Sequence, residues 1–245
     1  MKQEEYRNMR TNDETHWWFL GMAACKIALL ERFYKPSQRI DILEAGCGTG
    51  WFTKKLEKFG AVTAVDIEEK ALEICRQRGI TALIKADIAK IPVQDSLFDL
   101  VVCSEVIYHT YVPDDVAVMR EFKRILKPGG RVFISVPAHQ FLFSPHDVVN
   151  LTRQRYSKKQ VRELFEREGL DVEFITYANF FLFPIVCAVR MFQKITHAAA
   201  ASDVKKTIEP VNTILFAVLR VESLLLRYIS LPQGLSILCI GRKSK

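Results

Sequence analysis

The stretch Ile42-Leu43-Glu44-Ala45-Gly46-Cys47-Gly48-Thr49-Gly50 decides the fold predicted for this chain. It links a short apolar run, typical of a strand, to a helical pattern at 51–59. The three alternate glycines allow the backbone to turn sharply and let a ligand approach it closely. A second acidic residue, Asp66, ends the next apolar run. Because ligands of doubly wound sheets bind beyond the carboxyl ends of the strands, both features predict a ligand site at that edge.

Strand and helix patterns alternate on both sides of this stretch. Short runs rich in apolar and β-branched residues predict strands at 40–44, 61–66, 81–85, 98–103, 131–136, 170–177 and 235–241. Helices are predicted at 17–34, 51–59, 68–78, 113–127 and 157–168. Such alternation implies right-handed crossovers. The fold class is therefore α/β, with a Rossmann-like, doubly wound, seven-stranded sheet that is parallel except for an antiparallel last strand.

The chain divides into a core and two additions. We expect a helical cap at 1–38, the core at 39–177, an apolar helical insert at 178–234, and the final core strand at 235–245. The insert holds two apolar stretches, 179–196 and 211–229. In the second stretch, apolar residues recur at helical spacing and so form a stripe along one side of the predicted helix: Ile214, Leu215, Val218, Val221, Leu225 and Ile229. Two basic residues, Arg220 and Arg227, lie seven positions apart and share another face, so the helix is predicted to be amphipathic.

Composition narrows the class of protein without choosing a substrate. The chain has 245 residues and a formal net charge of +7, which permits an anionic substrate, an acidic membrane surface or nucleic acid. Its six cysteines form no C-x-x-C pair, so we expect no metal site and no disulfide framework, and a reducing cytoplasm fits. The polar N-terminus lacks a signal-peptide pattern, and no run of 18 apolar residues predicts a membrane-spanning helix.

The glycine spacing separates two kinds of nucleotide site. A dinucleotide fingerprint, G-x-G-x-x-G, would need its third glycine at position 51, which is Trp51. An anionic pyrophosphate is also disfavoured beside Glu44, whereas a sulfonium and an ammonium suit an acidic neighbour. The acidic residue followed by G-x-G-x-G resembles motif I of class I S-adenosylmethionine-dependent methyltransferases. Three later segments resemble the motifs that follow it in that family: Lys85 to Ile88, Phe98 to Glu105, and Leu126 to Arg131.

The resemblance implies a cofactor, S-adenosyl-L-methionine, which leaves as S-adenosyl-L-homocysteine, and a set of residues around it. Asp66 matches the residue that binds both ribose hydroxyls, and Asp87 the residue that bonds the exocyclic amine of adenine. The N-terminal segment with His16 and Trp17 would cover the methionine end, or else act as an aromatic anchor for the first helix. The complete implied set is Glu44, Gly46, Cys47, Gly48, Asp66, Ile67, Asp87, Ile88, Ser104, His16 and Trp17.

Further motifs are similar to those of a bacterial and archaeal methyltransferase subfamily often associated with glycan or lipid-linked sugar biosynthesis. They are His16-Trp17-Trp18-Phe19, His146-Asp147, Arg153-x-Arg155-Tyr156 and Leu231-Pro232-x-Gly234-x-Ser236. This similarity supplies no substrate.

Candidate catalytic groups follow the fourth and fifth predicted strands, at the active-site edge. His146, His109 and Tyr156 are candidates to move a proton or orient a substrate oxygen, because histidine titrates near neutrality. Arg153 and Arg155, with His139, are candidates to bind an acceptor, since guanidinium grips phosphate or carboxylate bidentately. Structural roles, such as a packed tyrosine ring or a solvated arginine, remain open for each.

We predict a methyltransferase that acts on a small-molecule or lipid-linked acceptor, such as a glycan or isoprenoid, at oxygen. Two alternatives are a nucleic-acid methyltransferase, for which no appended binding module or basic stripe is found, and a non-catalytic cofactor-binding regulator. The insert should begin and end beside the active site, as a lid, a peripheral membrane contact or a dimer interface. A monomer or homodimer in the cytoplasm, peripheral to the membrane if the insert binds it, fits these observations.

Overall fold

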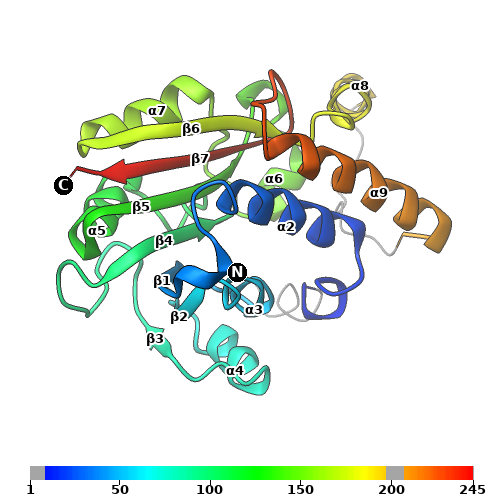
Figure 1. Cartoon of the computed structure of the whole chain (residues 1–245). Coiled ribbons are helices and arrows are strands. Elements are labelled where there is room, and N and C mark those ends of the chain that lie inside the picture. The colour runs from blue at the N-terminus through cyan, green and yellow to red at the C-terminus, as the bar shows by residue number, and fades with distance from the viewer. Residues whose placement is uncertain (1–8, 197–206, 245) are drawn as a thin grey trace.

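The computed structural model describes residues 9–196 and 207–244, which include one mixed sheet of seven strands in the order β3-β2-β1-β4-β5-β7-β6 (Figure 1). Strands β1 to β5 are parallel, and β7 lies antiparallel between β5 and β6. The predicted fold class, including the antiparallel last strand, is therefore confirmed. The strands are β1 Ile40–Ala45, β2 Gly60–Asp66, β3 Leu83–Lys85, β4 Phe98–Ser104, β5 Leu126–Pro137, β6 Leu170–Ala178 and β7 Ser236–Lys243.

Helices cover both faces of the sheet. On one face, α2 (Trp17–Leu30), α3 (Trp51–Leu56) and α9 (Glu209–Leu226) enclose a core that includes Leu100, Phe133 and Leu238. The other core lies under α5 (Asp115–Ile125) and α7 (Lys158–Arg167). Figure 1 shows α2 and α9 side by side on the first face. The remaining helices are α4 (Glu69–Gln77), α6 (Pro145–Val149), α8 (Phe183–Thr196) and the short 3-10 turns η1 (Pro36–Gln38) and η2 (Gln140–Leu142).

Several element boundaries differ from the sequence predictions. The first helix ends at Leu30, not at residue 34. The helix predicted at 113–127 spans Asp115–Ile125, and the Lys127-Pro128-Gly129-Gly130 segment belongs to β5 instead of forming a turn before it. A register shift between Phe98 and Leu100 lets β5 begin early beside β4. Two local sequence features mark helix ends in the structure: Gly79 has φ +75° after α4, and Ser157 with Gln160 forms the capping box of α7.

The apolar stripe predicted for the second insert helix is not the side that packs against the core. The side of α9 that packs against α2 buries Leu219, Glu222, Ser223 and Leu226, while Ile214 and Val221 are 63% and 53% exposed. Gly21 on α2 permits this close packing, because a Cβ there would lie 2.3 Å from Leu219. Tertiary contacts thus override the helical periodicity, and α9 turns part of its apolar surface outward.

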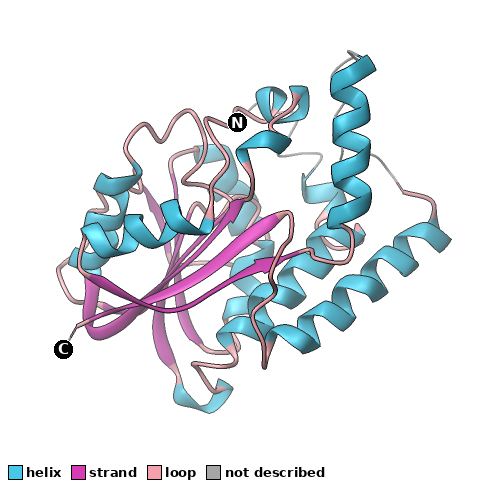
Figure 2. Cartoon of the chain, turned by 90° about the horizontal axis from the view of Figure 1, so that it is seen from above, coloured by secondary structure: helices cyan, strands magenta, loops and turns pink. Residues whose placement is uncertain are grey.

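The exposed apolar side chains of the described insert lie on both of its helices. On α8, Ile185 and Phe192 are 64% and 66% exposed, and α9 and the following turn add Ile214, Val221, Leu224 and Tyr228. Figures 1 and 2 show the two helices at the same end of the molecule. No helix in ranges 9–196 and 207–244 has the length and apolar character needed to cross a bilayer.

Candidate functional site

The glycine-rich loop between β1 and α3 adopts the backbone that its sequence requires. Gly46, Gly48 and Gly50 have φ values of +80°, +56° and +73°, a region that residues with a side chain rarely adopt. A Cβ on Gly46 would also lie 2.3 Å from Val106. The loop is fixed to the neighbouring strand, because the backbone N–H groups of Gly46 and Cys47 donate to the Val65 carbonyl.

Asp66 lies at the carboxyl end of β2, directly against this loop. Its carboxylate accepts the backbone N–H of Gly48 at 2.9 Å and that of Glu68 at 3.0 Å. Burial raises the pKa of Asp66, while the two backbone hydrogen bonds lower it. The neighbouring Ile67 is 48% exposed, so it presents an apolar surface beside the carboxylate. A carboxylate and an apolar side chain at one strand end suit a ribose joined to a flat base.

Glu44 is the buried acidic group at the end of β1. It is 2% exposed and accepts a hydrogen bond from the Thr53 hydroxyl of α3. Burial raises its pKa to about 8, against smaller lowering effects of Thr53 and Lys26. A cation placed near Glu44 would therefore relieve the cost of ionising this carboxyl group.

The N-terminal segment crosses the glycine-rich loop. Asp13 accepts a hydrogen bond from the Thr49 hydroxyl at 2.6 Å and forms an ion pair with Arg78 at 2.8 Å. His16, which is buried, caps α2 with its side chain, and the backbone N–H of Trp17 donates to the Asn212 side chain of α9 at 2.8 Å. The structure thus ties Trp17 to the insert, and Asp13 is a contact of the glycine-rich loop that the sequence analysis missed.

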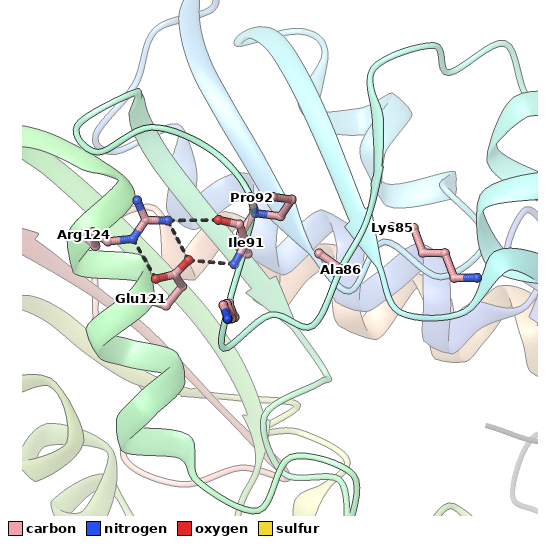
Figure 3. A pocket seen from close by; sticks show the side chains of 7 residues that line it. Lys85, Ala86, Ile91, Pro92, Glu121 and Arg124 are labelled. Atoms are coloured by element: carbon pink, nitrogen blue, oxygen red, sulfur yellow. Dashed lines mark hydrogen bonds and ion pairs between the residues drawn. The ribbon is translucent and has the colours of Figure 1, made fainter.

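The loop after β3 carries Asp87 and Ile88 on a braced backbone. Asp87 is exposed and accepts the backbone N–H of Ala89 at 2.8 Å, whereas Ile88 is buried. Figure 3 shows the brace on the far side of this loop, where Arg124 donates to Glu121 and to the Ile91 carbonyl. This brace borders an open hollow of about 440 Å³ that Lys85, Ala86 and Lys90 also line. Because Arg124 and Glu121 pair with each other and with the loop backbone, we assign this brace a structural role.

Comparison with known proteins agrees with this geometry. A family model described as a methyltransferase domain matches residues 43–134, from the glycine-rich loop to β5. Residues 43–134 of this chain are thus similar to a methyltransferase domain. The chain is 35% identical over 101 residues to a ubiquinone biosynthesis O-methyltransferase of Xanthomonas oryzae pv. oryzae, and 37% identical over 101 residues to one of Bordetella bronchiseptica. Each match covers 38% of this chain and 41% of the relative, so the chain spans less than half of the relatives' length.

Similarity over the whole chain comes from a solved structure. The complex between the Haloferax volcanii Trm112 methyltransferase activator and the putative methyltransferase contains a chain with a TM-score of 0.64 and 19% identity to this protein. The match covers 99% of this chain and 95% of that chain. At this level of identity the likeness concerns the fold, which therefore includes the N-terminal helix and the insert.

S-adenosylmethionine is the cofactor that the methyltransferase domain implies, and the residues present fit it. The Asp66 carboxylate at the end of β2 suits the ribose, and Glu44 suits a positive charge near the methionine end. A Cβ at Gly48 would lie 3.7 Å from the side chain of Met9, so the backbone there is covered by little more than one flexible side chain. No cluster of His, Cys, Asp or Glu that could hold a metal ion occurs in the described part of the chain.

The carboxyl end of β4 carries a polar cluster that sequence reasoning found only in part. Ser104 was expected there, and its hydroxyl accepts a hydrogen bond from the Lys26 ammonium of α2 at 2.6 Å. The same ammonium lies 3.4 Å from the Glu105 carboxylate, which also accepts a hydrogen bond from Ser135 on β5. Glu105 belongs to the motif at 98–105, but Lys26 escaped notice because it sits in an apolar helical pattern, far from β4 in the sequence.

The two histidines considered as catalytic candidates have partners within the protein. His109 is 8% exposed, and its ring nitrogens lie 3.0 Å from the Asn150 carbonyl and 3.2 Å from the Glu105 carbonyl. Burial lowers the pKa of His109. His146, on α6, accepts a hydrogen bond from the Asn150 side chain at 2.8 Å. Both rings thus contact Asn150, and their catalytic roles remain predictions.

The remaining candidates gather in the loop after β5, on the face covered by α5 and α7. The Tyr156 hydroxyl donates to Asp115 at 2.7 Å, and Arg153 pairs with the same carboxylate at 3.2 Å. Arg155 is 9% exposed and holds Asp147 through two of its nitrogens. Arg155 and Tyr156 are thus tied to internal carboxylates, which favours a structural role for both.

His139 lies close to this group but is arranged differently. Its ring stacks on Tyr177 of β6 with centroids 5.1 Å apart, its backbone has φ +63°, and its Nε2 atom is buried without a hydrogen-bond partner. Burial lowers the pKa of its imidazole. The predicted substrate contact of His139 stays a prediction, and the orphaned nitrogen is compatible with it.

Proposed function

We propose that this protein is an S-adenosylmethionine-dependent O-methyltransferase that acts on a small-molecule or lipid-linked acceptor. The observation that carries the proposal is the loop geometry, in which three left-handed glycines are held against the Asp66 carboxylate, within a segment that matches the methyltransferase domain. Transfer to oxygen is supported by the relatives, which are named ubiquinone biosynthesis O-methyltransferases.

When bound, S-adenosylmethionine supplies an electrophilic methyl group on a positively charged sulfur. The protein contributes binding, alignment and exclusion of water, which together supply much of the rate enhancement in such reactions. Asp66 would hold the ribose, Asp87 and Ile88 the adenine, and Glu44 the positive charge. The N-terminal segment with His16 and Trp17 would cover the methionine end and keep water away from the methyl group.

A lipid-linked acceptor is supported by the insert. Its two helices start beyond β6 and end before β7, so both connections lie at the carboxyl edge where the cofactor residues are found. Exposed apolar side chains on both helices offer a surface for an acyl or isoprenoid chain, or for the membrane that contains it. We propose peripheral membrane contact through this insert. A monomer can bind the membrane in this way. Alternatively, the exposed apolar side chains of α8 and α9 form the interface of a homodimer.

The decisive experiment for the proposed function is a labelled-methyl transfer assay. Purified protein and radiolabelled S-adenosylmethionine are offered a farnesylated catechol, an unprenylated catechol and total RNA and DNA. We expect label in the organic phase with the farnesylated catechol. Label in nucleic acid would instead support the nucleic-acid alternative, and cofactor binding without transfer to any acceptor would support a regulatory role.

Membrane contact predicts a second result. Replacing Phe192 and Val221 together by glutamate should reduce co-sedimentation with phosphatidylglycerol and phosphatidylethanolamine vesicles at least about tenfold, because each exposed apolar side chain contributes roughly 1.5–3 kcal/mol when buried. The matched control replaces Leu97 and Val148, which are 42% and 62% exposed outside the insert, by glutamate. Equal loss in both variants, or conversion of a dimer to a monomer without vesicle binding, would contradict the proposal.

A further inference from the structure

Lys26 is a buried cation that the proposed cofactor set does not use. The exposed fraction of its side chain is 9%, in a helix whose other buried side chains, such as Met22, Cys25 and Leu29, are apolar. Burying an ammonium group is costly unless charged and polar partners surround it. Its polar partners are the Ser104 hydroxyl at 2.6 Å and the Glu105 carboxylate at 3.4 Å.

Glu105 is held in an unusual backbone conformation at the same place. Its φ is +60°, in the left-handed region that glycine prefers. The backbone N–H of Glu105 donates to the Ser135 carbonyl, and the Ser135 hydroxyl donates to its carboxylate. Strained residues that several contacts hold in place occur preferentially at ligand sites. The exposed fraction of the Glu105 side chain is 29%, so a molecule arriving at the sheet edge can reach it.

The cluster lies where an acceptor has to meet the methyl group. Ser104 ends β4 and pairs with Ser135 on β5, and Glu44 lies on β1, the other neighbour of β4. Ligands of this sheet architecture bind beyond these strand ends. His109 and His146 are tied to Asn150, whereas the Glu105 side chain of the cluster is 29% exposed at this edge and can meet an acceptor.

We propose that Lys26 and Glu105 form the acceptor-oxygen site, in which Glu105 takes the proton of the acceptor hydroxyl and Lys26 holds the oxygen as its negative charge develops. This inference rests on the proposed O-methyltransferase function and narrows its substrate class to acidic hydroxyls, namely phenols and enols. Ser104 keeps the ammonium in place by accepting one of its hydrogen bonds.

The reaction step balances with groups already present. The acceptor oxygen forms a bond to the methyl carbon, the bond from that carbon to the sulfonium sulfur breaks, and its electron pair stays on sulfur. The hydroxyl proton passes to the Glu105 carboxylate and then to solvent. Lys26, freed from the neutralised Glu105, pairs with the oxygen during the transfer.

The substrate class follows from the size of the electrostatic effect. A cation within about 4–6 Å lowers the pKa of an acidic group by about 1–3 units. That shift brings a phenol, whose pKa is about 10, close to physiological pH. An aliphatic hydroxyl is far too weak an acid for one ammonium to ionise it to a useful extent.

A bound chromophore tests this site independently of turnover. The probe is 4-nitrocatechol, whose visible absorption reports its ionisation, added to the complex with S-adenosylhomocysteine. We expect it to ionise in the wild-type complex at a pH at least about one unit lower than in Lys26→Met. Lys26→Arg should keep most of the shift. Lys54→Met, which replaces an exposed lysine of α3, is the control and should match the wild type.

Other titratable groups interact electrostatically with Lys26 or Glu105. They are Cys25, Glu44, Cys103, Tyr108 and His109.

Measurements of kcat separate the role of Glu105 as the base from the role of Lys26 as the group that holds the oxygen. In Glu105→Gln, we expect kcat for catechol to fall about a hundredfold or more, but kcat for the more acidic 4-nitrocatechol to fall less than about tenfold. Lys26→Met should slow both when the cofactor is saturating, and its cofactor Kd should rise modestly because Lys26 lowers the pKa of Glu44. Wild-type turnover in Lys26→Met at saturating cofactor, an unshifted probe spectrum, or equal loss with both acceptors in Glu105→Gln would overturn the proposal. Transfer to aliphatic alcohols alone would overturn the substrate class and leave the proposed function standing, whereas transfer to no hydroxyl would overturn both.

Discussion

Replacing Asp66 by alanine is expected to weaken S-adenosylmethionine binding about a hundredfold or more. The Asp66 carboxylate lies at the carboxyl end of β2, where it would accept hydrogen bonds from both ribose hydroxyls. A hydrogen bond to a charged group contributes about 1.5–3 kcal/mol, and two of them account for at least about two orders of magnitude in Kd. The carboxylate also holds the backbone N–H of Gly48, so its loss loosens the loop that the cofactor must contact.

Isothermal titration calorimetry with S-adenosylhomocysteine measures this effect, and circular dichroism checks the fold. Asp66→Asn keeps an acceptor for the Gly48 N–H and should bind more weakly than the wild type but more tightly than Asp66→Ala. Glu68→Ala removes an exposed carboxylate two residues away and serves as the control. Wild-type affinity in Asp66→Ala, or the same loss in Glu68→Ala, would show that the ribose site lies elsewhere.

The parts of this structure that the sequence predicted depend on local constraints. Gly46, Gly48 and Gly50 stand where the backbone needs positive φ, and Ser157 with Gln160 caps α7 through residues three positions apart. The order of strands and helices then leaves few possible topologies. Local signals of this kind can be read without knowledge of what each element packs against.

The features that escaped prediction depend on contacts between distant segments. Glu222 is fully buried on α9 because its carboxylate accepts the backbone N–H groups of Asn179, Phe180 and Phe181 after β6. A helical-periodicity analysis assigns such a glutamate to the solvent face, and so it does not reveal which side of α9 packs against α2. Lys26 is a similar case, since its partners Ser104 and Glu105 lie on another element. Burial of a charge is unpredictable when the groups that satisfy it are remote.

Binding of S-adenosylmethionine should strengthen as the pH rises from 6 to 8, because Glu44 must ionise to meet the positive charges of the cofactor. Burial raises the pKa of Glu44 in the free protein from 4.5 to about 8, so the folded protein carries a proton there at pH 7 that the unfolded chain has lost. The cofactor favours the carboxylate and expels that proton. One proton released corresponds to a change in affinity approaching tenfold per pH unit.

The same proton links stability to pH in the free protein. Between pH 4.5 and about 8 the folded state binds more protons at Glu44 than the unfolded state, so this residue lowers the free energy of unfolding as the pH rises. Glu44→Gln, which stays neutral, should therefore raise the melting temperature more at pH 8 than at pH 6, while flattening the pH dependence of cofactor binding at a low affinity. Calorimetry in two buffers of different ionisation enthalpy counts the released proton directly. An unchanged slope in Glu44→Gln would assign the titrating group to another residue, and the acidic residue of the glycine-rich loop would then act through its hydrogen bond to Thr53 rather than through its charge.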